Sequence, residues 1–186
     1  MCKTTQRFLI LQICVVLALL LNAQTRSTLS PRIPQVSELR QMTRHSGVIF
    51  AGRVLSVQYL RPRFSNEVPT MRVTFRVEKG IRGARTGSLF VLREWAALWN
   101  SGERYRVGER VLLFLYPPSK AGLTSPVAGA RGRFPVDAKG QVILNAERAR
   151  LFEEAREAGW NRVPRANERI SLREVNRMIR RFGGEE

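Results

Sequence analysis

The chain has little of what catalytic and metal centres are usually built from. Its 186 residues include two cysteines and one histidine. Cys2 and Cys14 both lie in the N-terminal segment, so a chain cleaved after Ala23 would have no disulfide, no thiolate metal site and no cysteine nucleophile. His45 is the single histidine, and without a second ligand or a catalytic partner it is expected to have a structural role. The sequence therefore predicts no metal and no cofactor.

Acidic residues are also scarce, with 15 against 32 basic ones. The carboxylates of the central region are scattered over expected loops and strand ends, so they do not indicate a paired general acid and base. Neither an HExxH motif, a GxGxxG motif nor a P-loop occurs. These absences predict a protein that is not an enzyme, and no catalytic residue is assigned.

Basic residues are almost all arginine and give the chain a formal net charge of +17. The planar guanidinium of arginine favours two-pronged contacts to phosphate and carboxylate, so a polyanionic partner is one interpretation. Codon usage in a GC-rich genome is the other, because the arginines are dispersed along the chain except after Ala146. Both interpretations stay open at this point.

Residues 1–23 have the pattern of a secretory signal peptide. Lys3 and Arg7 precede an apolar run over residues 8–21, and Ala23 supplies the small residue before a cut. The run is shorter than the ~20 residues that a membrane span needs. We therefore expect a secreted or periplasmic protein with no transmembrane helix in the mature chain. An uncleaved N-terminal membrane anchor is the alternative.

The clearest strand signal lies in residues 71–83. Every second residue is apolar and those between are polar, which is the period of a strand with one buried face. The apolar positions are Met71, Val73, Phe75 and Val77. Gly80 and Gly83 end the segment, and apolar strands flank it, so we expect a middle strand of an antiparallel sheet.

Further strands are expected at residues 48–60, 88–95 and 109–116, and a hairpin is expected from residues 132–136 and 141–144. Gly52 inside the first of these indicates a bulge or a sharp bend. The run at 109–116 is almost continuously apolar, which predicts burial on both faces or a position at a barrel seam.

Helices are expected at both ends of this strand region. Ser37 can cap a short helix over residues 38–45, and Asn145 can cap a longer one that ends at Gly159. Ser171 and Glu174 have the spacing of a capping box, which predicts a last helix through Arg181.

Together these patterns predict a mainly β fold: a small five-stranded Greek-key barrel of the oligonucleotide/oligosaccharide-binding (OB) type, with a short N-terminal helix and C-terminal helices. The expected organisation is a signal peptide at 1–23, a flexible lead-in at 24–35, the barrel at 36–145 and a helical extension packed on it at 146–186.

Three segments, SGVIFAGRVLSV, VTFRVEKGIRG and YRVGERVLLFL, resemble the OB-type barrel of the netrin-like and tissue-inhibitor-of-metalloproteinase-like superfamily. The matched positions are Gly52, Val54, Thr74, Phe75, Val77, Gly83, Val107, Gly108 and Phe114. The resemblance covers roughly residues 48–115 and implies the fold. It does not imply the inhibitory mechanism, because the N-terminal cysteine that chelates the enzyme's zinc in those inhibitors has no counterpart here.

The segment REWAALWNSGERYR supplies the candidate ligand-binding residues, because aromatic side chains beside arginines can stack against sugar chains or single-stranded nucleic acid. The candidates are Arg93, Trp95, Trp99, Arg104, Tyr105 and Arg106. Packing of Trp95 and Trp99 in the core and rim of the barrel is the alternative.

The predicted export of the protein limits which partners are expected. Export argues against nucleic acid, so an unknown protein or an anionic envelope polymer is expected. The sequence predicts an exported, non-enzymatic binding or interaction module. The alternatives are a cell-envelope enzyme or protease-inhibitor-like protein, and polyanion binding through surface arginines.

Overall fold

The computed structural model describes residues 38–62, 64, 67–101, 104–153 and 164–183. Contacts divide the chain into two units, Met1–Gln35 and Val36–Glu186, and all described residues belong to the second. The predicted signal peptide and lead-in lie outside the described residues. Within those residues, no helix combines the length and the apolar character that crossing a membrane requires.

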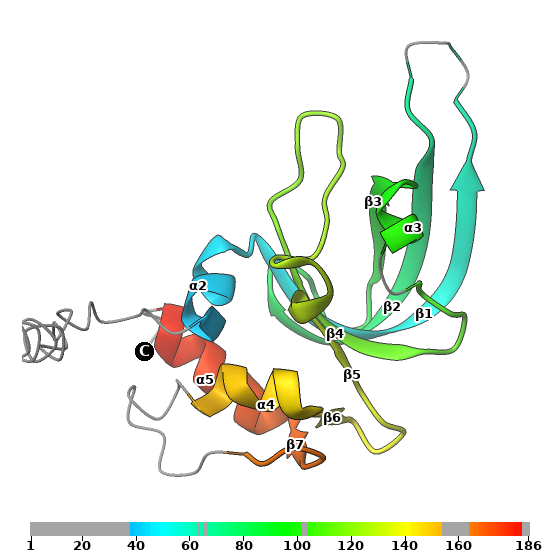
Figure 1. Ribbon diagram of the computed structural model, residues 1–186. Coiled ribbons are helices and arrows are strands. Elements are labelled where there is room, and N and C mark those ends of the chain that lie inside the picture. Colours follow the sequence, from blue (N-terminus) through cyan, green and yellow to red (C-terminus); the bar gives the residue numbers. More distant parts are fainter. Residues whose placement is uncertain (1–37, 63, 65–66, 102–103, 154–163, 184–186) are drawn as a thin grey trace, which may run out of the picture. The chain divides into compact units, whose positions relative to one another are not determined.

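The fold is mainly β, as predicted, with helices at both ends of the strand region (Figure 1). In chain order the elements are α2 (Glu38–His45), β1 (Val48–Leu60), β2 (Thr70–Arg82), β3 (Leu89–Trp95), α3 (Leu98–Ser101), β4 (Arg110–Leu115), the 3₁₀ turn η2 (Gly129–Gly132), β5 (Arg133–Pro135), β6 (Gln141–Ile143), α4 (Ala146–Glu153), β7 (Arg169–Ser171) and α5 (Leu172–Gly183).

Five strands form one antiparallel sheet in the order β3-β2-β1-β4-β5. The long strands β1 and β2 curve strongly in Figure 1. Strands β3 and β5 are the two ends of this ladder and do not pair with each other, so the described sheet is open and not a closed barrel.

Strand β2 confirms the period-2 pattern, since Met71, Val73, Phe75 and Val77 are all buried. Its pairing with β1 shifts register beside Gly52. A Cβ atom at Gly52 would lie 2.7 Å from the carbonyl oxygen of Arg76, so the two backbones approach too closely there for any other residue. This confirms the predicted irregularity at that glycine.

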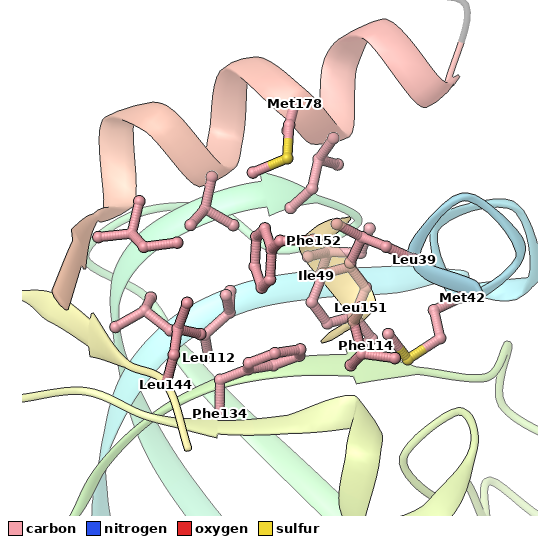
Figure 2. Close-up of a cluster of buried hydrophobic side chains, with 14 of the residues drawn as sticks. Leu39, Met42, Ile49, Leu112, Phe114, Phe134, Leu144, Leu151, Phe152 and Met178 are labelled. Atoms are coloured by element: carbon pink, nitrogen blue, oxygen red, sulfur yellow. The ribbon is translucent and has the colours of Figure 1, made fainter. Parts of the chain in front are cut away.

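Strand β4 and the first part of β1, residues 48–54, are buried on both faces, as the apolar run of β4 predicted. On one face, which we call the inner core, they pack against β2, β3 and Tyr105. On the other face, which we call the helix-side core, they pack against α2, α4 and α5. Figure 2 shows Phe152 of α4 between α5 and the strands, with Phe114 and Phe134 facing it from the sheet.

The predicted hairpin of residues 132–136 and 141–144 is confirmed only beside its turn, where an isolated antiparallel bridge joins Val136 to Val142. The ladder of strand β6 is formed with β7, which the sequence did not predict. Pro135 has no N–H with which to extend a ladder. Asp137 closes the turn as expected, because its Oδ1 accepts the N–H groups of Lys139 and Gln141.

Two of the predicted helix caps are confirmed, and the third, Ser37, lies outside the described residues. The side chain of Asn145 accepts the N–H of Arg148 at 2.8 Å, and Ser171 and Glu174 exchange the two hydrogen bonds of a capping box. Helix α4 is described only to Glu153, so the predicted end at Gly159 lies outside the described residues.

Candidate binding sites around strand β3

Strand β3 separates the candidate residues onto two sides. Alternation along the strand buries Leu92 and Glu94 on the inner side, whereas Trp95 is 53% exposed. Arg93 is half-buried and lies directly opposite Arg72 of β2. The predicted residues therefore do not form one site: Trp99 and Tyr105 line a pocket with Glu94, and Arg93 lines another.

The first of these, which we call the aromatic pocket, lies between the end of β3, α3 and the segment that leads from β4 into β5. Its volume is about 390 Å³. The rings of Trp99 and Tyr105 stand 5.8 Å apart at 54°. The lining residues are Glu94, Leu98, Trp99, Tyr105, Tyr116, Ser125, Pro126, Ala128, Gly129, Ala130 and Arg133. Most of this surface is apolar, which suits a ring or an apolar side chain.

Glu94 is the buried acid of the aromatic pocket, with only 4% of its surface exposed. Burial raises the pKa of its carboxyl group, while the hydrogen bond from Trp99 Nε1 and the positive charge of Arg133 both act to lower that pKa. The carboxyl group therefore anchors the indole of Trp99, and this hydrogen bond ties α3 to β3.

Arg133 is held at the far wall of the same pocket by three groups. Its Nη2 donates to Glu109 Oε1 at 2.6 Å and to the carbonyl oxygen of Arg104 at 3.2 Å, and its guanidinium lies 4.3 Å above the ring of Tyr105. Glu109 Oε2 also accepts the N–H of Arg106 at 3.0 Å. Arg104 and Arg106 thus contribute main-chain groups to this cluster.

The second pocket, which we call the arginine pocket, has a volume of about 680 Å³. It lies between the hairpin of β1 and β2, the outer side of β3 and the loop that follows β4. The lining residues are Tyr59, Leu60, Arg61, Pro62, Glu67, Val68, Thr70, Arg72, Arg93, Ala121 and Leu123. Three of them carry a guanidinium group, and one carries a carboxylate.

Among the described residues, none of the three arginines Arg61, Arg72 and Arg93 forms an ion pair. The Nε of Arg93 is buried, and no acceptor within the described part of the chain hydrogen-bonds to it. A buried donor without a protein acceptor is costly unless water or a bound group pairs with it. The arginine pocket therefore combines three guanidinium groups without a carboxylate partner among the described residues.

The sequence missed Arg61 and Arg72, because their approach to Arg93 depends on strand register. The aligned pairs Arg72–Arg93 and Leu60–Thr70 bring the loop end of the β1–β2 hairpin beside β3. Glu94 is one of the scattered carboxylates of the central region and was not among the predicted site residues, yet the alternation of β3 places it on the same side as buried Leu92. That alternation was the one signal in the sequence that could have found it.

Few of the described residues around β3 could act in catalysis or bind a metal ion. Within the described ranges, no cluster of three or more histidine, cysteine, aspartate or glutamate residues is placed to hold a metal ion. Arg93 and Glu94 line different pockets, so these neighbours in sequence do not converge on one site. No protein-family model matches the chain, and no curated protein sequence matches it either.

Proposed function

We propose that this protein is an exported, non-enzymatic binding module that recognises an anionic partner through the arginine pocket. One observation carries the proposal: Arg61, Arg72 and Arg93 line one pocket without a carboxylate partner in the described structure. Guanidinium groups bind carboxylate, phosphate and sulfate groups with paired, charge-assisted hydrogen bonds.

Other arginines of the protein do have carboxylate partners in the described structure, unlike those of the arginine pocket. Arg53 and Arg110 share Glu78, and Arg133 pairs with Glu109. The protein has 15 carboxylates against 32 basic residues, so carboxylate partners are scarce. Within the described residues, three arginines without such a partner line one pocket: Arg61, Arg72 and Arg93.

The partner we propose is a polymer of the cell envelope that carries repeated anionic groups. Export to the envelope or beyond, expected from residues 1–23, places the protein beside such polymers. Exposed Tyr59 at the rim offers an aromatic surface on which a sugar ring can pack. Glu67 at the same rim would disfavour a second anionic group close to it and so help to orient the chain.

The proposal includes a barrel of the OB type, similar to that of the netrin-like superfamily. The strand order β3-β2-β1-β4-β5 supports it, because a five-stranded barrel opened between β3 and β5 has this order. The bend of β1 at Gly52 and the inner core enclosed by β1, β2 and β3 support it as well.

The test is binding of heparin and of polyglutamate to the purified chain from Gln24 onward. The double variant Arg72→Gln/Arg93→Gln should bind at least about tenfold more weakly, since each lost charge-assisted contact contributes about 1.5–3 kcal/mol. Arg177→Gln/Arg180→Gln, which removes the same charge from the exposed side of α5, is the matched control and should change affinity less than about threefold. Equal losses in the two double variants would show that net charge alone is responsible.

A cell-envelope enzyme is the alternative, and it would depend on Glu94 as an acid in the aromatic pocket. Glu94→Gln keeps the acceptor for Trp99 and removes the titrating group. If the proposed function is right, this variant should bind the polymers as the parent does, because Glu94 lines the aromatic pocket and not the arginine pocket.

A further inference from the structure

Strand β3 is an end of the five-stranded sheet. Strand β2 occupies one side of it. On the other side, one main-chain hydrogen bond reaches it from the described residues: the N–H of Thr124 donates to the carbonyl oxygen of Arg93 at 2.8 Å. The stretch of β3 before Arg93 is therefore left with an open edge.

Two hydrogen bonds establish which main-chain groups point into this edge. Ser88 faces β2, because its carbonyl oxygen accepts the N–H of Val77 at 2.9 Å, and Arg93 faces away, because its carbonyl oxygen accepts from Thr124. Orientation alternates along an antiparallel strand. The N–H and C=O groups of Leu89 and Val91 therefore point away from β2, and no group among the described residues hydrogen-bonds to them.

The side chains beside this open edge are unusually apolar for an exposed surface. Leu89 is 60% exposed, Val91 50% and Trp95 53%. They lie at alternate positions and so share one face of the strand. An open edge with exposed apolar side chains is a template for an added strand. We call Leu89, Val91, Arg93 and Trp95 the β3 edge surface.

The positive charge around the β3 edge surface indicates which kind of partner strand would bind there. Arg72 lies opposite Arg93, and Arg76 lies opposite Leu89, and neither Arg72 nor Arg76 has an ion-pair partner in the described part of the chain. A second copy of this protein would bring the same arginines together, and each copy carries a net charge of +17. An extended segment is complementary to this face instead when its side chains on that one face are apolar beside Leu89 and Val91 and acidic beside Arg93.

We infer that the β3 edge surface binds an extended acidic segment of a partner protein, which adds to the sheet as a strand beside β3. This rests on the anion recognition proposed for the arginine pocket and goes beyond it, because it assigns the adjacent edge of β3 to a second ligand, a polypeptide. The main-chain groups of Leu89 and Val91 pair with the segment, its apolar side chains pack on Leu89 and Val91, and its carboxylates reach Arg93 and the arginine pocket.

The test uses the short capped peptide Val-Thr-Val-Thr-Glu-Thr-Glu, which as a strand presents its valines and glutamates on one face and its threonines on the other. Binding is measured by isothermal titration and by fluorescence anisotropy. The control peptide has the same side chains but N-methyl groups on every second amide, which remove the hydrogen-bond donors of one edge without changing charge. The unmodified peptide should bind at least about tenfold more tightly, because several main-chain hydrogen bonds of about 0.5–1.5 kcal/mol are lost in the control. Equal affinity of the two peptides, or binding of neither, would overturn the strand addition.

A protein variant gives an independent measurement. In Val91→Pro the lost N–H is one that β2 does not use, so the fold should persist while peptide affinity falls at least about tenfold. Val91→Thr keeps the N–H and should bind within about threefold of the parent. If Val91→Pro does not fold, the N-methylated peptide decides alone. Heparin retention that persists when the peptide fails to bind would leave the proposed polyanion binding intact and reject only the strand.

Discussion

Arg72 on β2 and Arg93 on β3 lie directly opposite each other in the ladder, although like charges in that arrangement weaken a sheet. We expect Arg93→Thr to raise the free energy of unfolding by about 0.2–1 kcal/mol, because it removes both the repulsion and the buried Nε without an acceptor. Urea denaturation measures this. Arg76→Thr removes the same charge opposite Leu89 and should change the free energy of unfolding less. An equal gain in both variants would show that the effect comes from net charge.

Glu94 should make stability depend on pH. Burial raises the pKa of Glu94 in the folded protein above its ordinary value of 4.5, so the folded state binds the proton more tightly than the unfolded state. This contribution is fully present below pH 4.5 and is lost as pH rises through the folded-state pKa. Glu94→Gln should therefore gain stability relative to the parent between pH 4 and pH 7 in urea denaturation. A difference that is the same at both pH values would contradict the buried acid.

Trp99 should report on the same hydrogen bond. Glu94→Leu leaves the indole N–H of Trp99 without its acceptor, and we expect a loss of about 1–3 kcal/mol of stability and a change in tryptophan fluorescence. Glu94→Gln, which keeps an acceptor, is the matched control and should retain the parent spectrum. Identical spectra for the two variants would show that the indole is held by other contacts.

Gly52 should tolerate no side chain. A Cβ atom there would lie 2.7 Å from the carbonyl oxygen of Arg76, so Gly52→Ala should cost about 1–3 kcal/mol through displacement of β2. Ser56→Ala, further along the same strand, is the control and should change stability by less than about 0.5 kcal/mol. Thermal unfolding followed by circular dichroism compares the two variants. Equal melting temperatures would contradict the close contact at Gly52.

The contribution of the α5 capping box to stability should be measurable by a single substitution. Ser171→Ala removes the hydroxyl that accepts the N–H of Glu174 at 3.2 Å, and we expect a loss of about 0.5–2 kcal/mol. Ser171→Thr retains the hydroxyl, which also donates to Glu174 Oε2 at 2.8 Å, and should lose less. A loss as large in the threonine variant would indicate that Ser171 acts through β7 and not through the cap.

Local patterns predicted most of the fold because they act over a few residues. The alternation in β2, the apolar run of β4 and the caps at Asn145 and Ser171 each depend on neighbours along the chain. The pairing of β6 with β7 was missed because it joins Val142 to Ile170 across a helix, and no local signal records such a contact.

The sites were predicted less well, for the same physical reason. Trp99 and Tyr105 were found because they are close in sequence, but Arg133, which covers the ring of Tyr105, comes from a different strand. The arginine pocket depends on the register that sets Arg72 opposite Arg93. A one-residue shift of that register would place Arg72 on the other face, so composition alone could not reveal the pocket.

The position of β4 between the two cores has a consequence for folding. Leu112 and Phe114 contact the helix-side core, whereas Val111, Leu113 and Leu115 contact the inner core. Neither core can lose its packing without exposing a strand that the other requires. The helices at the chain ends are therefore part of the same cooperative folding unit as the sheet, and removing α5 should destabilise strands that it never touches.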